Sequence, residues 1–254
     1  MSAWSRGTMA FAGFTLQEYL RSGRIAVEGV AVLAAVWLLF WPRSASGLDG
    51  RLFFSLGGLF LLALGAYTAM AIMRLGNRPQ GYVLLARRLG RSGYLLGLYL
   101  ASIIVVLATY LSLSLVVALI YALYRLPLNL TLAGWWLGTV PLVLDMALAA
   151  AFMTLLSPLV MSAAPRLTIL ALFVVALSTD LTKMAALPIA NVLGPLQMLL
   201  GLPLLPVMGG FALAVQQTYG PGALGIIAGQ VVVGWALLTA AVYAFERRDL
   251  ILSS

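Results

Sequence analysis

The chain of 254 residues contains no cysteine and no histidine, and charged residues make up only 9% of it. Without thiolates and imidazoles it cannot build the common zinc sites, a Cys nucleophile or a His-based catalytic triad. Intramembrane proteases that depend on Ser–His pairs or on His–Glu zinc motifs are therefore excluded. We expect neither a metal site nor a catalytic residue.

A phosphate-binding loop is missing as well. The only lysine, Lys183, follows Thr182 and does not belong to a Gly-x-x-x-x-Gly-Lys-Ser/Thr motif, which is the sequence that cradles nucleotide phosphates in many ATPases. We therefore expect no cofactor in this chain. If the protein uses ATP, another subunit must bind the ATP and Mg and hydrolyse the nucleotide.

Long apolar runs dominate what is present, since 63% of the residues are hydrophobic. About 20 mostly apolar residues cross the hydrocarbon core as a helix, whereas barrel strands would alternate in polarity. The sequence predicts one all-α transmembrane domain over residues 1–254. Its six predicted spans are Ile25–Trp41, Leu52–Met73, Tyr94–Tyr124, Gly134–Leu156, Leu167–Leu181 and Ala223–Ala244.

Basic residues are unequally divided between the two sides of these spans. Short loops rich in Lys and Arg stay cytoplasmic, which predicts that both termini are cytoplasmic and that the protein lies in the bacterial inner membrane. The formal charge of +8 is explained by this topology and by anionic lipid headgroups, so we expect no nucleic-acid partner. One side carries Arg6, Arg21, Arg24, Arg74, Arg78, Arg87, Arg88, Arg91, Arg166, Arg247 and Arg248, and the other carries Arg43, Arg51, Arg125 and Lys183.

A short amphipathic segment precedes the first span. Thr15 and Glu18 have the spacing of a capping box, which marks the start of a helix. The segment Phe14–Arg24, with Arg21 and Arg24 on its polar side, is predicted to lie flat at the cytoplasmic interface. Residues 1–24 would then form a cytoplasmic tail and an interfacial helix.

The main cytoplasmic loop covers residues 74–93, between the second and third spans. Its second half, Tyr82–Arg91, is predicted to form a short helix in which apolar residues precede basic ones. Topology explains the arginines, but the apolar residues suggest a surface that docks onto a partner. The residues that would make this contact are Tyr82, Leu84, Leu85, Arg87, Arg88 and Arg91.

The stretch 183–221 is apolar but is broken repeatedly by proline and glycine. Proline removes a backbone donor and disrupts a helix, so a straight span is disfavoured. We predict a re-entrant hairpin of two short helices, about Ala190–Leu200 and Gly209–Tyr219, between spans five and six. Eight full spans fit less well, because neither half reaches the required length without a proline.

Acidic residues near the spans are few. Asp145 is the only one near the middle of a span, where a charge is costly and usually functional. It is either part of a translocation route or subunit interface, or a structural carboxyl held by hydroxyls such as those of Thr139 and Thr154. Glu28 is expected to reach toward headgroups or Arg24. Asp180 and Lys183 are expected to form a surface ion pair.

The order of these pieces resembles the membrane subunit of an ATP-binding cassette (ABC) exporter of the type-two permease family. The resemblance rests on the interfacial segment, the basic loop 74–93, the broken hairpin 183–221 and the charged ending Phe245–Leu250. It implies a dimer of two six-span subunits, identical or different. It also implies that Tyr82–Arg91 is a coupling helix that docks on a separate ATP-binding subunit. The Glu-Arg pair found early in this loop in many family members is absent, since Arg78 has no acid beside it.

The function implied is export of an amphiphilic or lipid-like substrate, because buried charges are so few. Three other classes remain open. The chain could be a haem-pathway export subunit, a proton-coupled secondary transporter that uses Asp145, or a non-transporting membrane scaffold.

Overall fold

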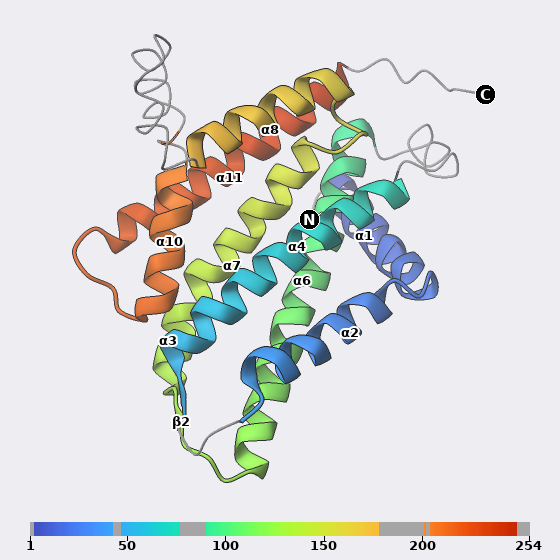
Figure 1. Ribbon diagram of the computed structural model, residues 1–254. Helices are drawn as coiled ribbons and strands as arrows, with labels where there is room; N and C mark the ends of the chain where they lie inside the picture. Colours follow the sequence, from blue (N-terminus) through green and yellow to red (C-terminus); the bar gives the residue numbers. More distant parts are fainter. Residues whose placement is uncertain (1–2, 43–46, 77–89, 178–200, 202–203, 248–254) are drawn as a thin grey trace.

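The computed structural model describes residues 3–42, 47–76, 90–177, 201 and 204–247, and helices make up almost all of them (Figure 1). A two-residue parallel strand pair is the exception in the described part of the chain. The all-α class is therefore confirmed. The elements are α1 Ala3–Arg21, α2 Ile25–Ala35, the π-helical turn η1 Val36–Phe40, β1 Leu48–Asp49, α3 Gly50–Leu52, the π-helical turn η2 Phe53–Gly57, α4 Gly58–Gly76, α6 Gly90–Leu123, β2 Leu128–Asn129, α7 Leu132–Leu155, α8 Ala163–Leu177, α10 Leu205–Gln216 and α11 Ala223–Glu246.

Within the described residues, four stretches are helical, long and apolar enough to cross a membrane: Gly50–Gly76, Gly90–Leu123, Leu132–Leu155 and Ala223–Glu246. They coincide with the second, third, fourth and sixth predicted spans. The pair formed by α1 and α2–η1 adds a fifth candidate, but it bends by 70° at a short break. The helix α8 is apolar and shorter. A membrane protein of several spans is thus supported, and the total of six stays a prediction.

The N-terminal helix begins earlier than the sequence indicated. Thr15 lies in the middle of α1 and donates its hydroxyl to the Phe11 carbonyl at 3.0 Å, so it does not cap a helix start. Threonine inside a helix commonly bonds to the carbonyl one turn back, and the capping-box spacing with Glu18 was therefore misleading. The buried residues of α1 recur at helical spacing, and Phe11 among them contacts Tyr94 and Gly97 of α6. They are Thr8, Phe11, Ala12, Thr15 and Tyr19.

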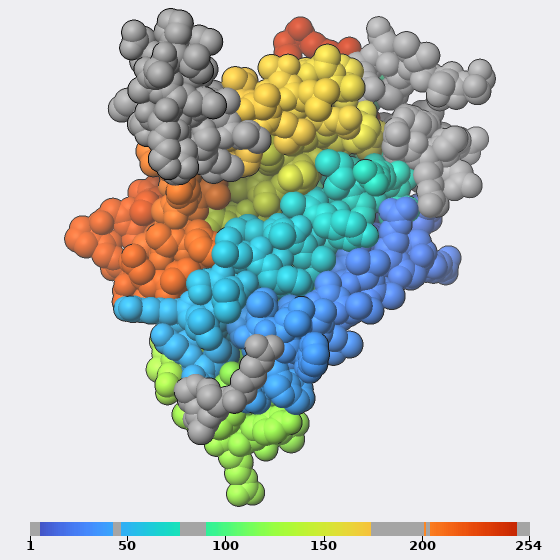
Figure 2. Space-filling model, in the orientation of Figure 1, coloured from blue at the N-terminus to red at the C-terminus, as the bar shows by residue number. Residues whose placement is uncertain are grey.

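The core has two apolar clusters, one at each end of the helices. We call these ends the α1 end and the β end, after α1 and the β1–β2 pair (Figure 1). Phe11, Tyr94 and Phe245 belong to the first cluster, and Phe54 and Tyr110 belong to the second. In Figure 2 the blue and cyan surfaces of α1, α2 and α4 adjoin along one face.

Close contacts between helices in both clusters depend on glycine residues, which have no side chain. A Cβ on Gly97 of α6 would lie 2.6 Å from the Phe11 ring, and one on Gly138 of α7 would lie 2.4 Å from the Phe54 ring. Close approach of a backbone to a bulky group is a common reason for glycine in a helix. Gly97 therefore permits the close approach of α1 to α6.

The helix α10 lies within the segment predicted as a re-entrant hairpin. The predicted helix in this half was Gly209–Tyr219, whereas α10 spans Leu205–Gln216. The helix begins earlier because Pro206 is compatible with a first helical turn. The helix packs on α7 and α11 and is too short to cross a bilayer. The other predicted half, Ala190–Leu200, and the Asp180–Lys183 pair lie outside the described residues.

Proline also explains how α7 is joined to the turn after α10. Pro141 lies inside α7 and cannot donate a hydrogen bond to the carbonyl of Leu137. The Tyr219 hydroxyl donates to that carbonyl at 3.0 Å instead. The carbonyl that Pro141 leaves without a helical donor is thus used for a contact between α7 and the segment that leads into α11.

Candidate functional site

The first candidate site is a junction around Tyr94, in the first turns of α6 at the α1 end. The Tyr94 ring stacks on Phe11 of α1 with centroids 4.6 Å apart and on Phe245 of α11 at 6.5 Å. Its hydroxyl donates to the carbonyl of Gly76, the last residue of α4, at 2.6 Å. One buried side chain therefore contacts three other helices.

This Tyr94 junction holds both ends of the predicted coupling loop. The loop leaves α4 after Gly76 and returns at the start of α6, where Arg91 donates to the Glu246 carbonyl of α11 at 2.7 Å. Of the predicted docking residues, only Arg91 is described, and it binds backbone within this chain. Tyr82, Leu84, Leu85, Arg87 and Arg88 lie outside the described residues, and their role stays a prediction.

The second candidate site surrounds Glu28, and here the expectation was wrong. Glu28 is buried between α1, α2 and α4 and does not reach toward headgroups. The hydroxyl of Tyr19 donates to its Oε1 atom, and the Thr68 hydroxyl donates to the same atom at 2.9 Å. Arg24 instead donates to the Ala71 carbonyl at 2.9 Å. Two hydroxyl donors satisfy Oε1, which offsets part of the desolvation cost of burying the acid, while Oε2 is buried without a hydrogen-bond partner.

The Glu28 cluster also joins the helices on either side of the bend between α1 and α2. Tyr19 lies in α1, Glu28 in α2 and Thr68 in α4, so the three side chains join the helices across the 70° bend.

The third candidate site is Asp145, which is only 1% exposed in the middle of α7. Gln230 of α11 donates its amide N–H groups to Asp145 Oδ1 at 2.7 Å and to the Pro141 carbonyl at 3.2 Å. Gly210 of α10 completes the contact, because a Cβ there would lie 1.8 Å from Gln230 Nε2. Three helices of the second half of the chain, α7, α10 and α11, therefore meet at one carboxyl group.

The partner of Asp145 differs from the hydroxyls considered from the sequence. Thr139 bonds to Tyr110 and to the Trp135 carbonyl, and Thr154 donates to the Ala150 carbonyl at 2.8 Å. Among the described residues, Asp145 Oδ2 and Gln230 Oε1 are buried without a hydrogen-bond partner. Sequence reasoning missed Gln230, although a lone amide in an apolar helix was a usable signal.

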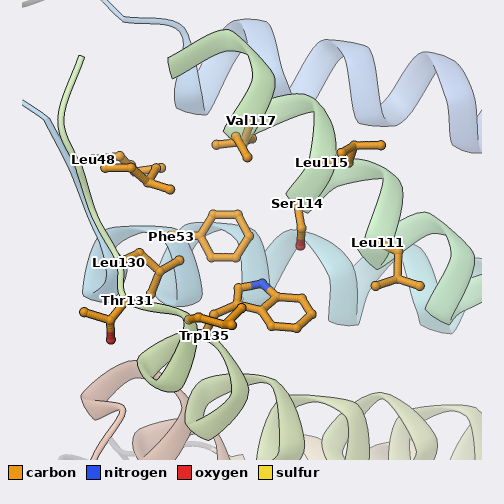
Figure 3. Close-up of a pocket in the computed structure, with 12 residues that line it drawn as sticks. Leu48, Phe53, Leu111, Ser114, Leu115, Val117, Leu130, Thr131 and Trp135 are labelled. Atoms are coloured by element: carbon orange, nitrogen blue, oxygen red, sulfur yellow. The ribbon is translucent and has the colours of Figure 1, made fainter. Parts of the chain in front are cut away.

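An apolar cavity of about 440 Å³ lies at the β end, between α6 and the segments around β1 and β2. Figure 3 shows Phe53, Ser114 and Trp135 converging in its middle, with Leu48 and Leu130 toward one end and Leu111 at the other. The Trp135 ring is nearly parallel to that of Tyr110, with centroids 5.9 Å apart. No local sequence pattern indicated this cavity, because its walls come from three separated segments.

Comparisons with known proteins leave the family open. No protein-family model, no curated protein and no solved structure matches the chain.

Proposed function

We propose that this chain is the permease subunit of an ABC exporter of the type-two permease family. In this proposal it has six spans, a re-entrant hairpin at 183–221 and both termini in the cytoplasm of a bacterial cell. It pairs with a second permease subunit, and a separate cytoplasmic subunit binds ATP and Mg. Energy from that subunit drives export of an amphiphilic or lipid-like substrate.

The Tyr94 junction is the observation that carries the proposal. A docking subunit can move spans only if the loop it contacts is mechanically joined to them. Tyr94 and Arg91 join the two ends of the loop to α1, α4 and α11. A displacement of the loop would therefore act on several helices together. ATP shifts such an equilibrium only through different affinities for the two arrangements.

The geometry gives less support to a proton-coupled transporter that uses Asp145. Proton pathways usually contain several ionisable groups inside the membrane, and Asp145 packs tightly against Gln230 and Gly210. We therefore propose that Asp145 holds α7, α10 and α11 together at the centre of the permease. Neither a haem-export role nor a scaffold role is favoured by a specific contact.

Copurification of ATPase activity tests the proposal. The tagged protein is purified from its native membranes into nanodiscs, and Mg-ATP hydrolysis by the preparation is measured. We expect hydrolysis by the wild-type preparation and its loss when Leu84, Leu85, Arg87 and Arg88 are all replaced by alanine. Arg6→Ala is the control, since this arginine is exposed on α1 and lies outside the loop, and it should retain hydrolysis. A well-folded wild-type preparation that hydrolyses no ATP would overturn the proposal.

A further inference from the structure

We infer that the cavity at the β end binds one acyl chain of an anionic phospholipid. This inference requires only that the protein is embedded in a membrane, and it does not depend on the permease proposal. The volume of about 440 Å³ falls within the range of roughly 300–1,000 Å³ typical of ligand pockets.

The chemistry of the walls selects a hydrocarbon occupant. Most of the lining residues are aliphatic or aromatic. The Ser114 hydroxyl already donates to the Tyr110 carbonyl at 3.0 Å, and the Thr131 side chain accepts the N–H of Gly134 at 3.0 Å as the cap of α7. A polar ligand would lose its hydration in this cavity with little compensation, whereas an acyl chain would lose none.

The cavity also borders the surface that lipid chains would cover. Leu111, Leu115 and Leu132 belong to its lining and are 53%, 61% and 75% exposed. The rings of Trp41 and Tyr124 pack edge to face. Trp41 directly follows η1, and Tyr124 directly follows α6. Aromatic residues of this kind mark the membrane interface, so the cavity lies where acyl chains approach the headgroup region.

Charge at the same end favours an anionic headgroup. Arg51 follows Leu48, and Arg125 precedes Leu128, by three residues each, and both arginines are exposed. Leu48 and Leu128 are paired partners in β1 and β2 and line the cavity. The pairing therefore brings Arg51 and Arg125 to the same rim, together with the exposed Asp49 of β1, and a phosphate can bind to the two arginines while its chain enters the cavity.

Photolabelling tests the inference on the whole protein in nanodiscs. The probe is a phosphatidylglycerol with a diazirine in the middle of one acyl chain, and labelled residues are mapped by mass spectrometry. We expect labelling of Phe53 and Leu130 inside the cavity. We also expect labelling of Leu119, which is 52% exposed on α6 and does not line the cavity.

A larger side chain that fills the cavity should remove only the labels inside it, those on Phe53 and Leu130. Ser114→Phe or, as a milder change, Ala118→Leu should reduce labelling of Leu130 at least several-fold and leave Leu119 unchanged. Ile104→Phe is the control, because Ile104 is exposed on α6 away from the cavity. Labelling confined to exposed residues such as Leu119 in the wild-type protein would overturn the inference.

Headgroup dependence is measured with the matching phosphatidylcholine probe. A basic residue near a membrane surface contributes about 1 kcal/mol toward anionic lipid, which corresponds to about a five-fold preference for each arginine. The preference for phosphatidylglycerol should disappear in Arg51→Ala/Arg125→Ala while cavity labelling remains. Equal labelling by both probes in the wild-type protein would contradict the anionic headgroup. Crosslinking of Leu130 to a second copy of the chain would show that protein occupies the cavity.

Discussion

Replacement of Gly210 by alanine is the sharpest perturbation of the Asp145 site. Gly210 lies in α10, and a Cβ at this position would be 1.8 Å from Gln230 Nε2 and 3.1 Å from Asp145 Oδ1. The added methyl group cannot share this space with the Gln230 amide. Gln230 must therefore turn away, and Asp145 Oδ1 then loses its donor, which lies at 2.7 Å in the wild-type structure.

The magnitude follows from the broken hydrogen bond. A hydrogen bond that is lost so that its buried acceptor has no partner costs about 1–3 kcal/mol, and more when the acceptor carries a charge. We expect Gly210→Ala to lower the free energy of unfolding by about 3 kcal/mol in total. For a chain of this size the loss corresponds to a fall of roughly 6–12 °C in the unfolding midpoint.

Thermal unfolding in mild detergent measures this effect, and Gly225→Ala provides a matched control. Gly225 lies in α11 and a Cβ there meets nothing within 4 Å, so alanine should be neutral or stabilise by up to about 1 kcal/mol. The double variant Gly210→Ala/Gln230→Ala should be about as stable as Gln230→Ala alone. Equal midpoints for Gly210→Ala and Gly225→Ala would refute the reasoning.

Three smaller changes test other contacts. Tyr94→Phe keeps the aromatic stacking but leaves the Gly76 carbonyl without its donor, so the unfolding midpoint should fall by an amount equivalent to about 1–3 kcal/mol; an unchanged midpoint would argue against the junction. Thr131→Ala removes the N-cap of α7 and should cost about 1 kcal/mol in the same assay, whereas Thr131→Ser should cost little. Tyr219→Phe frees the Leu137 carbonyl at an exposed site and should cost about 0.5–1.5 kcal/mol, and faster amide exchange of the α10–α11 turn should accompany it.

Span positions were the most predictable part of the fold. Hydrophobic run length depends only on local composition, and the predicted span Tyr94–Tyr124 lies within α6, apart from its last residue. The start of α1 was predicted incorrectly because the Thr15–Glu18 spacing is compatible with a helix interior as well as with a cap. Tertiary packing decided between them, since Thr15 is buried inside α1, the helix that packs on α6.

The candidate sites were only partly predictable, because their partners are distant in sequence. A lone acid in an apolar helix identified Asp145, but no local pattern pairs it with Gln230 across 85 positions. Glu28 was expected to reach toward headgroups or Arg24, because it lies near the start of the first predicted span. The structure buries it instead, through Tyr19 and Thr68 on two other helices. Likewise, the stacking of Tyr94 between two phenylalanines depends on the contact of α6 with α1 and α11.

Site-specific crosslinking tests the central claim most directly, because the chain has no cysteine of its own. A photo-crosslinker is attached to Leu85→Cys in the predicted coupling helix and, as a control, to Leu128→Cys at the β end, and both are activated in native membranes with Mg-ATP. The proposed permease function predicts an adduct between position 85 and an ATP-binding subunit, and no such adduct from position 128. An absence of ATP-binding adducts at position 85, or equal yields at both positions, would contradict it.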